Sequence, residues 1–230
     1  ISAMYTPDES ICVICGDLFH HKLQISSHGI VLFYKLLHSI ANLMPIFIIQ
    51  GNHDLIQEYD DENNDLIAAL LKHNPHPNIK YFDHTTTFTY DNIHFGITSI
   101  RDILSKNTSY GLVDNLPMFP KPVHGNFNVA LSHVTVQNAL LHNYTRTNGG
   151  VPLEWFKGYD LALLGDIHLQ TAKYSKKHDL SYGYPGSLVQ QDFGEGIYNH
   201  GLLLWELNDT GDALNSVKKL HVHNPYGRAN

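Results

Sequence analysis

Four apolar segments of the chain end in the same way, and this repeated ending constrains the fold more than any other feature. Each is an apolar run followed by polar side chains that can bind a cation or carry a proton: ICVICGD, IFIIQGNHD, NVALSH and LALLGDIH. Between the first two, the apolar residues of 25–43 recur at helical spacing, and Pro45 follows. Strand, helix and strand, with both strands apolar throughout, predict a parallel pair buried on both faces.

The second half of the chain is expected to be largely β-structure. Residues 85–100 are rich in β-branched side chains around Asp91 and Asn92, which predicts a hairpin. A helix is expected over ENNDLIAALLKH, capped by Asp60 or Asp61, and a short helix is expected to open at Pro152. The pattern predicts an α/β fold with a second sheet packed near the first, and no domain boundary within residues 1–230.

Composition limits the class of protein. The 230 residues are 43% hydrophobic and contain no apolar run of membrane length, so we expect a soluble, intracellular protein with one sizeable core. A net charge of −7 makes a poor bare binder of nucleic acid, although bound divalent cations would change the local field. Cys12 and Cys15 are interpreted as small buried apolar residues of a reduced protein, with a redox pair as the alternative.

The polar residues at the strand ends form the candidate functional site. Strands of one open α/β sheet deliver their carboxyl-end loops to a shared crevice, so we expect these side chains to converge. Oxygen and imidazole ligands without thiolate suit Mn²⁺, Mg²⁺, Fe²⁺ or Zn²⁺. Each motif alone also fits an ordinary turn or a packed histidine, but four together favour a site. The candidates are Asp17, Asn52, His53, Asp54, His133, Asp166 and His168.

The ordered motifs resemble those of the calcineurin-like metallophosphoesterases, in which GDLFH, GNHD, SH and GDIH would occupy the last four of five positions. Within that superfamily, CGDLFHHK and YPGSLVQQDFGEG resemble the SbcD-type nucleases of DNA repair, and also the SbcD-like phosphoesterases of large DNA viruses. The resemblance implies a layered α/β/β/α metallophosphoesterase sandwich. It also implies two divalent metal ions, Mn²⁺ foremost, and metal-dependent hydrolysis of phosphodiesters by a DNA nuclease, either exonuclease or endonuclease.

The resemblance further implies which residues hold the metal ions. Asp17 would bridge the two ions. Asn52, His133 and Asp166 would complete the ligands of one ion, and His168 would help to hold the other.

The same resemblance implies the catalytic roles and exposes two departures from the family pattern. His53 would lie near the scissile phosphate and protonate the leaving oxygen, with Asp54 orienting its ring. The Asp-x-His motif that should come first is absent and the chain begins with Ile1, so we expect a truncated N-terminus and a weakened site for one ion. Asp166 stands where the family usually has His, which favours a harder cation or marks a degenerate site.

DNA is the expected substrate, and a coiled-coil SbcC-type ATPase is the expected partner. Lys173, Lys176 and Lys177 are candidates for contacts with the DNA backbone, with a solvated hairpin face as the alternative. Tyr182 and Tyr184 are either base-stacking residues or ordinary strand aromatics. The expected location is the cytoplasm or nucleus, or the host cytoplasm for a viral protein. Two other functions stay open: a phosphatase or small phosphodiesterase of the same superfamily, and a non-catalytic scaffold.

Overall fold

A three-stranded parallel sheet forms the first half of the fold. The computed structural model describes residues 9–20, 25–55, 65–104, 119–191, 195–196, 200–207 and 217–223. In spatial order the strands of this sheet are β1 (Cys12–Ile14), β2 (Ile46–Ile49) and β3 (Ile79–Phe82). Helix α1 (Ser27–Ala41) connects β1 to β2, and α2 (Leu66–His73) lies between β2 and β3 in the chain. The predicted parallel strand–helix–strand unit is therefore confirmed.

A six-stranded mixed sheet forms the second half. Its spatial order is β4 (Thr86–Tyr90), β5 (Ile93–Thr98), β6 (Phe127–His133), β7 (Leu161–Gly165), β9 (Leu180–Tyr184) and β8 (Thr171–Ser175). The four central strands are parallel, and each edge strand is antiparallel to its neighbour. The β4–β5 hairpin turns at Asp91, whose φ is 52°, as the sequence predicts. A separate antiparallel pair consists of β10 (Gly201–Trp205) and β11 (Val217–His221).

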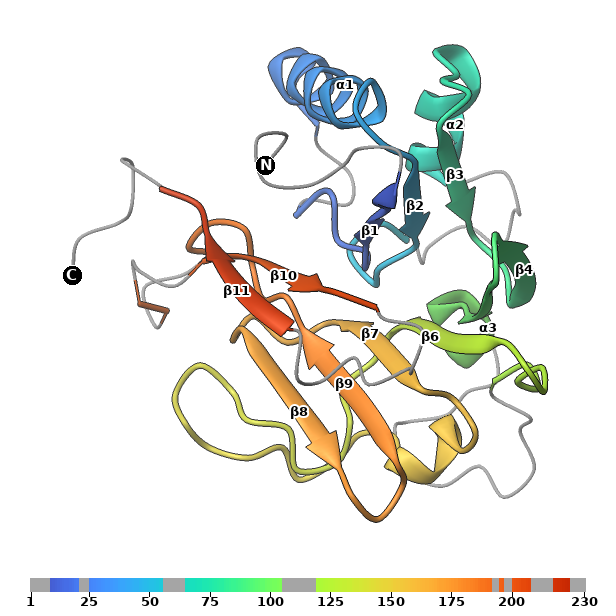
Figure 1. The fold of residues 1–230 in the computed structure, drawn as a ribbon. Coiled ribbons are helices and arrows are strands. Elements are labelled where there is room, and N and C mark those ends of the chain that lie inside the picture. The colour runs from blue at the N-terminus through green and yellow to red at the C-terminus, as the bar shows by residue number, and fades with distance from the viewer. Residues whose placement is uncertain are drawn as a thin grey trace.

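The two larger sheets stack on each other through an aromatic core. Phe47 of β2 meets Phe88 edge-on at 4.8 Å between ring centroids, and Phe95 at 5.5 Å. Helices α1 and α2 lie on the other side of the three-stranded sheet (Figure 1). They bury Leu37 and Ile67 against β2. These contacts place a helical layer, two sheets and further helices in sequence.

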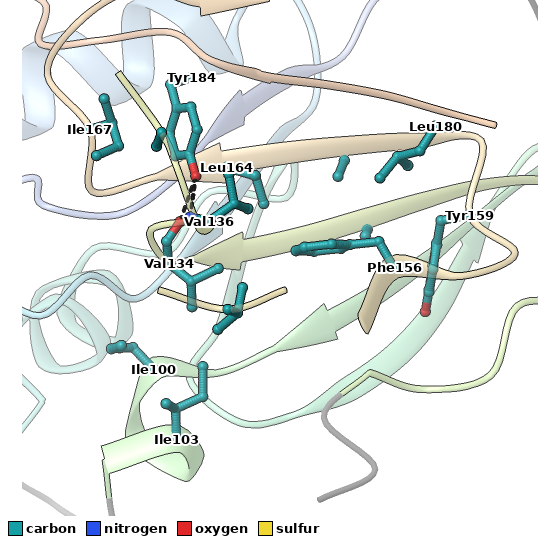
Figure 2. Packing of buried hydrophobic residues seen from close by; sticks show 14 of the residues in the cluster. Ile100, Ile103, Val134, Val136, Phe156, Tyr159, Leu164, Ile167, Leu180 and Tyr184 are labelled. Carbon is teal, nitrogen blue, oxygen red and sulfur yellow. Dashed lines mark hydrogen bonds between the residues drawn. The ribbon is translucent and has the colours of Figure 1, made fainter. Parts of the chain in front are cut away.

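The outer face of the six-stranded sheet is covered by α3 (Ile100–Leu104) and a 3₁₀ helix, η2 (Leu153–Phe156). Figure 2 shows Tyr184 within this cluster, where its hydroxyl accepts the N–H of Val136 at 2.8 Å and donates to the Val134 carbonyl at 3.0 Å. Tyr184 is 1% exposed, so it is a strand aromatic of the core rather than a base-stacking residue. The α/β/β/α sandwich predicted from the sequence is confirmed.

The start of α2 differs from the prediction. Its N-cap is Asp65, whose side chain accepts the N–H of Ala68, whereas Asp60 and Asp61 lie outside the described residues. The short helix predicted at Pro152 is present as η2, with Pro152 at its N-cap. None of the helices in the described ranges has the length and apolar character needed to cross a membrane.

Candidate functional site

The polar strand ends meet where the two stacked sheets adjoin. Asp17 and Asn52 follow β1 and β2 of the three-stranded sheet, whereas His133 ends β6 and Asp166 follows β7 of the six-stranded sheet. The expectation that one sheet delivers all four is wrong. Each sheet supplies two carboxyl-end loops, and the stacking of the sheets brings the two pairs together.

His133 is the centre of this convergence. Its side chain is 2% exposed, and Nδ1 donates to the carbonyl oxygen of Cys15 at 2.6 Å. Its Nε2 lies 2.9 Å from Asn52 Oδ1, 3.3 Å from Asp17 Oδ2 and 3.9 Å from Asp166 Oδ1. One ring nitrogen therefore faces a carbonyl oxygen, and the other faces three oxygens from three different strand ends.

This geometry requires positive charge among the oxygens. A neutral imidazole has one N–H, and His133 donates it from Nδ1 to the Cys15 carbonyl. The lone pair on Nε2 would then face the three oxygens. A second ring proton or a cation relieves that repulsion. Burial lowers the pKa of His133, but the hydrogen bond and charge of Asp17 outweigh it and the pKa is raised. Burial likewise raises the pKa of Asp17, but the contacts with His133 prevail and lower it.

Glycines allow the strand ends to come this close. Gly16 has φ 89°, and a Cβ there would lie 2.6 Å from both Gly51 Cα and His133 Nδ1. A Cβ on Gly165 would collide with the Cys15 carbonyl oxygen and with the same imidazole. The close backbone approach that glycine permits is therefore made between the strand ends themselves.

Asp54 connects the loops that follow β1 and β2. It is 5% exposed, and its carboxylate accepts the backbone N–H groups of Asp17 at 2.8 Å, Gly51 at 2.9 Å and Phe19 at 3.3 Å. Burial raises the pKa of Asp54 to about 6, with the Gly51 N–H opposing the shift and the charge of Asp17 adding to it. These three backbone contacts give Asp54 a structural role in shaping the site.

His53 is oriented by a residue that the sequence analysis did not single out. Its Nδ1 lies 3.0 Å from the carbonyl oxygen of His20, and the two imidazole rings stack with centroids 5.2 Å apart. The backbone N–H of His53 donates to Asp17 Oδ1 at 2.9 Å. In the structure the orienting contact expected from Asp54 is thus made by His20, whose place at the end of the GDLFH motif was the available signal.

Both aspartates that face His133 have left-handed backbones. Asp17 has φ 56° and Asp166 has φ 88°. Such strain in non-glycine residues costs on the order of 1–3 kcal/mol each and is typical of functional sites. The hydroxyl of Thr135 donates to Asp166 Oδ2 and fixes this carboxylate. Thr135 was not predicted, although it lies only two residues after His133.

The remaining candidates lie in the segments after β7. His168 follows Asp166 by two residues, and its Nδ1 lies 2.5 Å from Oε1 of Glu195. Lys177 is exposed and pairs with Glu154 at 2.7 Å, and Lys176 is also exposed.

Lys173 is the half-buried member of the three predicted lysines. Burial lowers its pKa, and the charge of Arg146 lowers it further, so these two cations lie near each other. Arg146 also acts on Tyr182, which is opposite Lys173 in the β8–β9 ladder. A basic and aromatic group therefore lies on the outer face of the six-stranded sheet.

Comparison with known proteins agrees with this architecture. A family model described as calcineurin-like phosphoesterase matches residues 5–170. The chain belongs to the calcineurin-like phosphoesterase family. Members of this family generally bind divalent metals and hydrolyse phosphoesters.

Two viral proteins are similar to this chain. Over 226 residues it is 30% identical to "Uncharacterized protein R555" of Acanthamoeba polyphaga mimivirus, a match covering 96% of the chain but 16% of that protein. It is 28% identical over 226 residues to "Putative phosphoesterase 244L" of Invertebrate iridescent virus 6, covering 94% of the chain and 71% of that protein. The chain thus spans less than a fifth of the length of the mimivirus protein.

The donor set around His133 fits a divalent cation. Across the described ranges, no three His, Cys, Asp or Glu side chains stand at the spacing of a metal site. Instead, Asp17, Asp166 and the amide oxygen of Asn52 each lie within 4 Å of His133 Nε2. The two carboxylates and the amide oxygen are ligand types that suit Mn²⁺ and Mg²⁺, and the imidazole nitrogen is one that suits Fe²⁺ and Zn²⁺. The negative charge of the two carboxylates is of the sign that a bound cation neutralises.

Proposed function

We propose that this phosphoesterase is a divalent-cation-dependent DNA nuclease of the SbcD type. The observation that carries the proposal is the position of His133 Nε2, which faces oxygens of Asp17, Asn52 and Asp166. Such a cluster, built at the carboxyl ends of strands from two sheets, would attract cations. The cations would in turn place positive charge where a phosphate would bind.

The proposed ligands are those that the motifs imply. Asp17, Asn52, His133 and Asp166 would hold one ion, and Asp17 with His168 would hold a second, Mn²⁺ being the proposed metal. The bound cations would supply Lewis acidity toward the phosphoryl group and activate water.

His53 is the proposed proton donor to the leaving oxygen. Because its Nδ1 is engaged by the His20 carbonyl, Nε2 is the nitrogen left to exchange a proton with the substrate. The stacked ring of His20 limits rotation of the imidazole about its side-chain bonds. A fixed orientation favours proton transfer, since a general acid acts only within hydrogen-bond reach of the departing atom.

The choice of DNA rests on the basic and aromatic group on the outer face of the six-stranded sheet. Lys173 and Arg146 would neutralise backbone phosphates, and the half-buried Tyr182 lies opposite Lys173. Of the three predicted lysines, Lys177 is the weakest candidate for a phosphate contact, because its charge is already paired with Glu154. The proposal includes a coiled-coil SbcC-type ATPase as partner, on the strength of the motif resemblance alone.

A non-catalytic scaffold is the second candidate, and one observation favours it. Asp166 replaces the usual histidine and is fixed by the Thr135 hydroxyl, so this carboxylate also has a purely structural contact. In that case the fold would be retained for binding, and the cluster around His133 would be held together by protons.

One assay separates these candidates. The purified protein is supplied with Mn²⁺ and offered single- and double-stranded DNA, an aryl phosphodiester and an aryl phosphomonoester. A nuclease cleaves DNA, and the Asn52→Ala variant loses the activity. Hydrolysis of aryl esters without DNA cleavage identifies a phosphatase or small phosphodiesterase. Absence of turnover on all four substrates supports the scaffold.

A further inference from the structure

The segment that follows β9 folds back onto His168. Gly186 has φ 78°, and a Cβ there would lie 2.7 Å from the carbonyl oxygen of His168. The backbone N–H of Ser187 donates to that same carbonyl at 3.1 Å. The main chain of His168 is therefore fixed by residues that lie about twenty positions later in the sequence.

The side chain of His168 is held by the same segment. Glu195 is 4% exposed, and its Oε1 accepts from His168 Nδ1 at 2.5 Å. Its Oε2 accepts the backbone N–H of Gln191 at 2.9 Å and the Ser187 hydroxyl at 3.1 Å. A buried carboxylate with donors on both oxygens has little freedom to move, so it holds the imidazole in one orientation.

A second histidine anchors this segment. His200 is 7% exposed, and its Nε2 lies 2.6 Å from the carbonyl oxygen of Gly196, the residue after Glu195. Its Nδ1 lies 2.9 Å from Ser187 Oγ. The side chain of Gln190 donates to the Glu195 carbonyl at 2.9 Å. These contacts hold the backbone on both sides of the Glu195 carboxylate.

We infer that Glu195 is a positioning residue that sets the tautomer and ring orientation of His168 for cation binding. The inference rests on the proposed function, in which His168 is a metal ligand. The carboxylate accepts a hydrogen bond from Nδ1–H and so keeps the proton on Nδ1. The lone pair on Nε2 is then available to bind a cation. Carboxylates that orient ligand imidazoles in this way also restrict ring rotation.

The first test measures the imidazole itself in cation-free protein. Nitrogen-15 NMR of the histidine rings is expected to show His168 protonated on Nδ1 in the wild type and in Glu206→Ala, an exposed acid-to-alanine control. In Glu195→Ala the proton is expected to redistribute toward Nε2, and Glu195→Gln is expected to restore Nδ1–H because its amide oxygen accepts. An unprotonated Nδ1 in the wild type, or an unchanged ring in Glu195→Ala, overturns the inference.

The second test measures cation affinity by Mn²⁺ titration with calorimetry. Loss of an orienting partner typically weakens metal binding about 10- to 100-fold, and we expect this for one of two ions in Glu195→Ala. Glu195→Gln keeps the side-chain volume and the acceptor but removes the charge that raises the basicity of the imidazole. It is expected to weaken the same ion less than Glu195→Ala does, and it carries the test where the alanine variant fails to fold. Wild-type affinity in both variants overturns the inference. A wild type that binds no Mn²⁺ refutes the proposed function, while the NMR result still decides the role of Glu195.

Discussion

The contacts of His53 with His20 leave one ring nitrogen for the proposed proton transfer, so the role of His53 can be tested separately from that of the proposed cation ligands. We predict that His53→Ala lowers turnover by about 100- to 10,000-fold, the usual contribution of a general acid. Mn²⁺ content should be retained, because the His53 ring is oriented by His20, which lies outside the cluster around His133. The measurements are kcat on DNA and metal analysis of the same sample.

Asn52→Ala is the matched comparison for that variant. Asn52 Oδ1 lies 2.9 Å from His133 Nε2, so its loss should lower both turnover and metal content. Loss of both ions from His53→Ala would contradict the assignment and make His53 a ligand.

The two cysteines are predicted to be unreactive thiols in the folded protein. Burial raises the pKa of Cys12 to about 11, and burial together with the charge of Cys12 raises the pKa of Cys15 to about 12. The neutral thiols favour the folded state up to the ordinary thiol pKa of 9.0, and this contribution is lost as pH rises from 9 toward 12. At pH 8, alkylation by iodoacetamide should be much slower in the folded protein than in urea, as followed by mass spectrometry.

Equal alkylation rates in buffer and in urea would show that the thiols are accessible. A disulfide between the two cysteines would restore the redox interpretation that the sequence left open. Both cysteines are free thiols in the structure.

The sequence predicted polar strand ends that the structure brings together around His133, but not all of their partners. Polar groups after an apolar strand are visible in a sequence, so Asp17 and His133 could be found there. The backbone N–H groups that Asp54 accepts, and the carbonyl that His53 contacts, are not visible, because every residue carries the same main-chain groups. Glu195 was missed because it lies 27 positions from His168 in the chain.

At the scale of elements, the carboxyl ends of β1, β2 and β7 pack backbone against backbone. We predict that Gly165→Ala lowers the free energy of unfolding by about 1–3 kcal/mol, the usual cost of overpacking. The added Cβ would collide with the Cys15 carbonyl and the His133 ring, and neither can move without disturbing the site. Urea denaturation is the measurement.

Gly149→Ala is the control for this change. A Cβ at Gly149 would meet no atom within 4 Å, and its backbone is not left-handed. Equal stability of the two variants would show that the strand ends can separate at little cost.

Helices and strands were predicted correctly where a residue pattern extended over many positions. They were missed where the element was short or depended on residues far apart in the chain. The apolar spacing of α1 and the hairpin of β4 and β5 follow from local sequence. Helix α3 has five residues, too few to show a period, and it follows β5 directly. Asp65 acts as the cap of α2 while it also accepts hydrogen bonds from Tyr81 and Gln50, which no local pattern indicates.

At the scale of the whole molecule, a cation that binds only the folded state must stabilise it. Saturation at 100 times the dissociation constant adds about 2.7 kcal/mol. For a chain of this size, we predict that Mn²⁺ raises Tm by about 5–10 °C, given roughly 2–4 °C per kcal/mol. Differential scanning fluorimetry with and without EDTA measures the shift.

Asn52→Ala should reduce this shift, since it removes an oxygen that faces His133 Nε2. An equal Tm with Mn²⁺ and with EDTA in the wild type would show that the cluster does not bind the ion.

The division of the site between two sheets could not be predicted from the sequence. Apolar strands such as β2 and β6 look alike whether they share a sheet or face each other across a core, because both arrangements bury the same side chains. The stacking depends on ring contacts such as Phe47 with Phe95, which join residues far apart in the chain.

The aromatic core between the sheets therefore also sets the distances between the polar side chains at the strand ends. Asp17 follows a strand of one sheet and His133 ends a strand of the other. The distance between their side chains therefore depends on the thickness of the aromatic core between the sheets. Trimming Phe47 would alter that thickness without touching any polar residue. Substitution of hydrophobic residues alone would in this way change the fit of the cluster around His133 to the proposed cation.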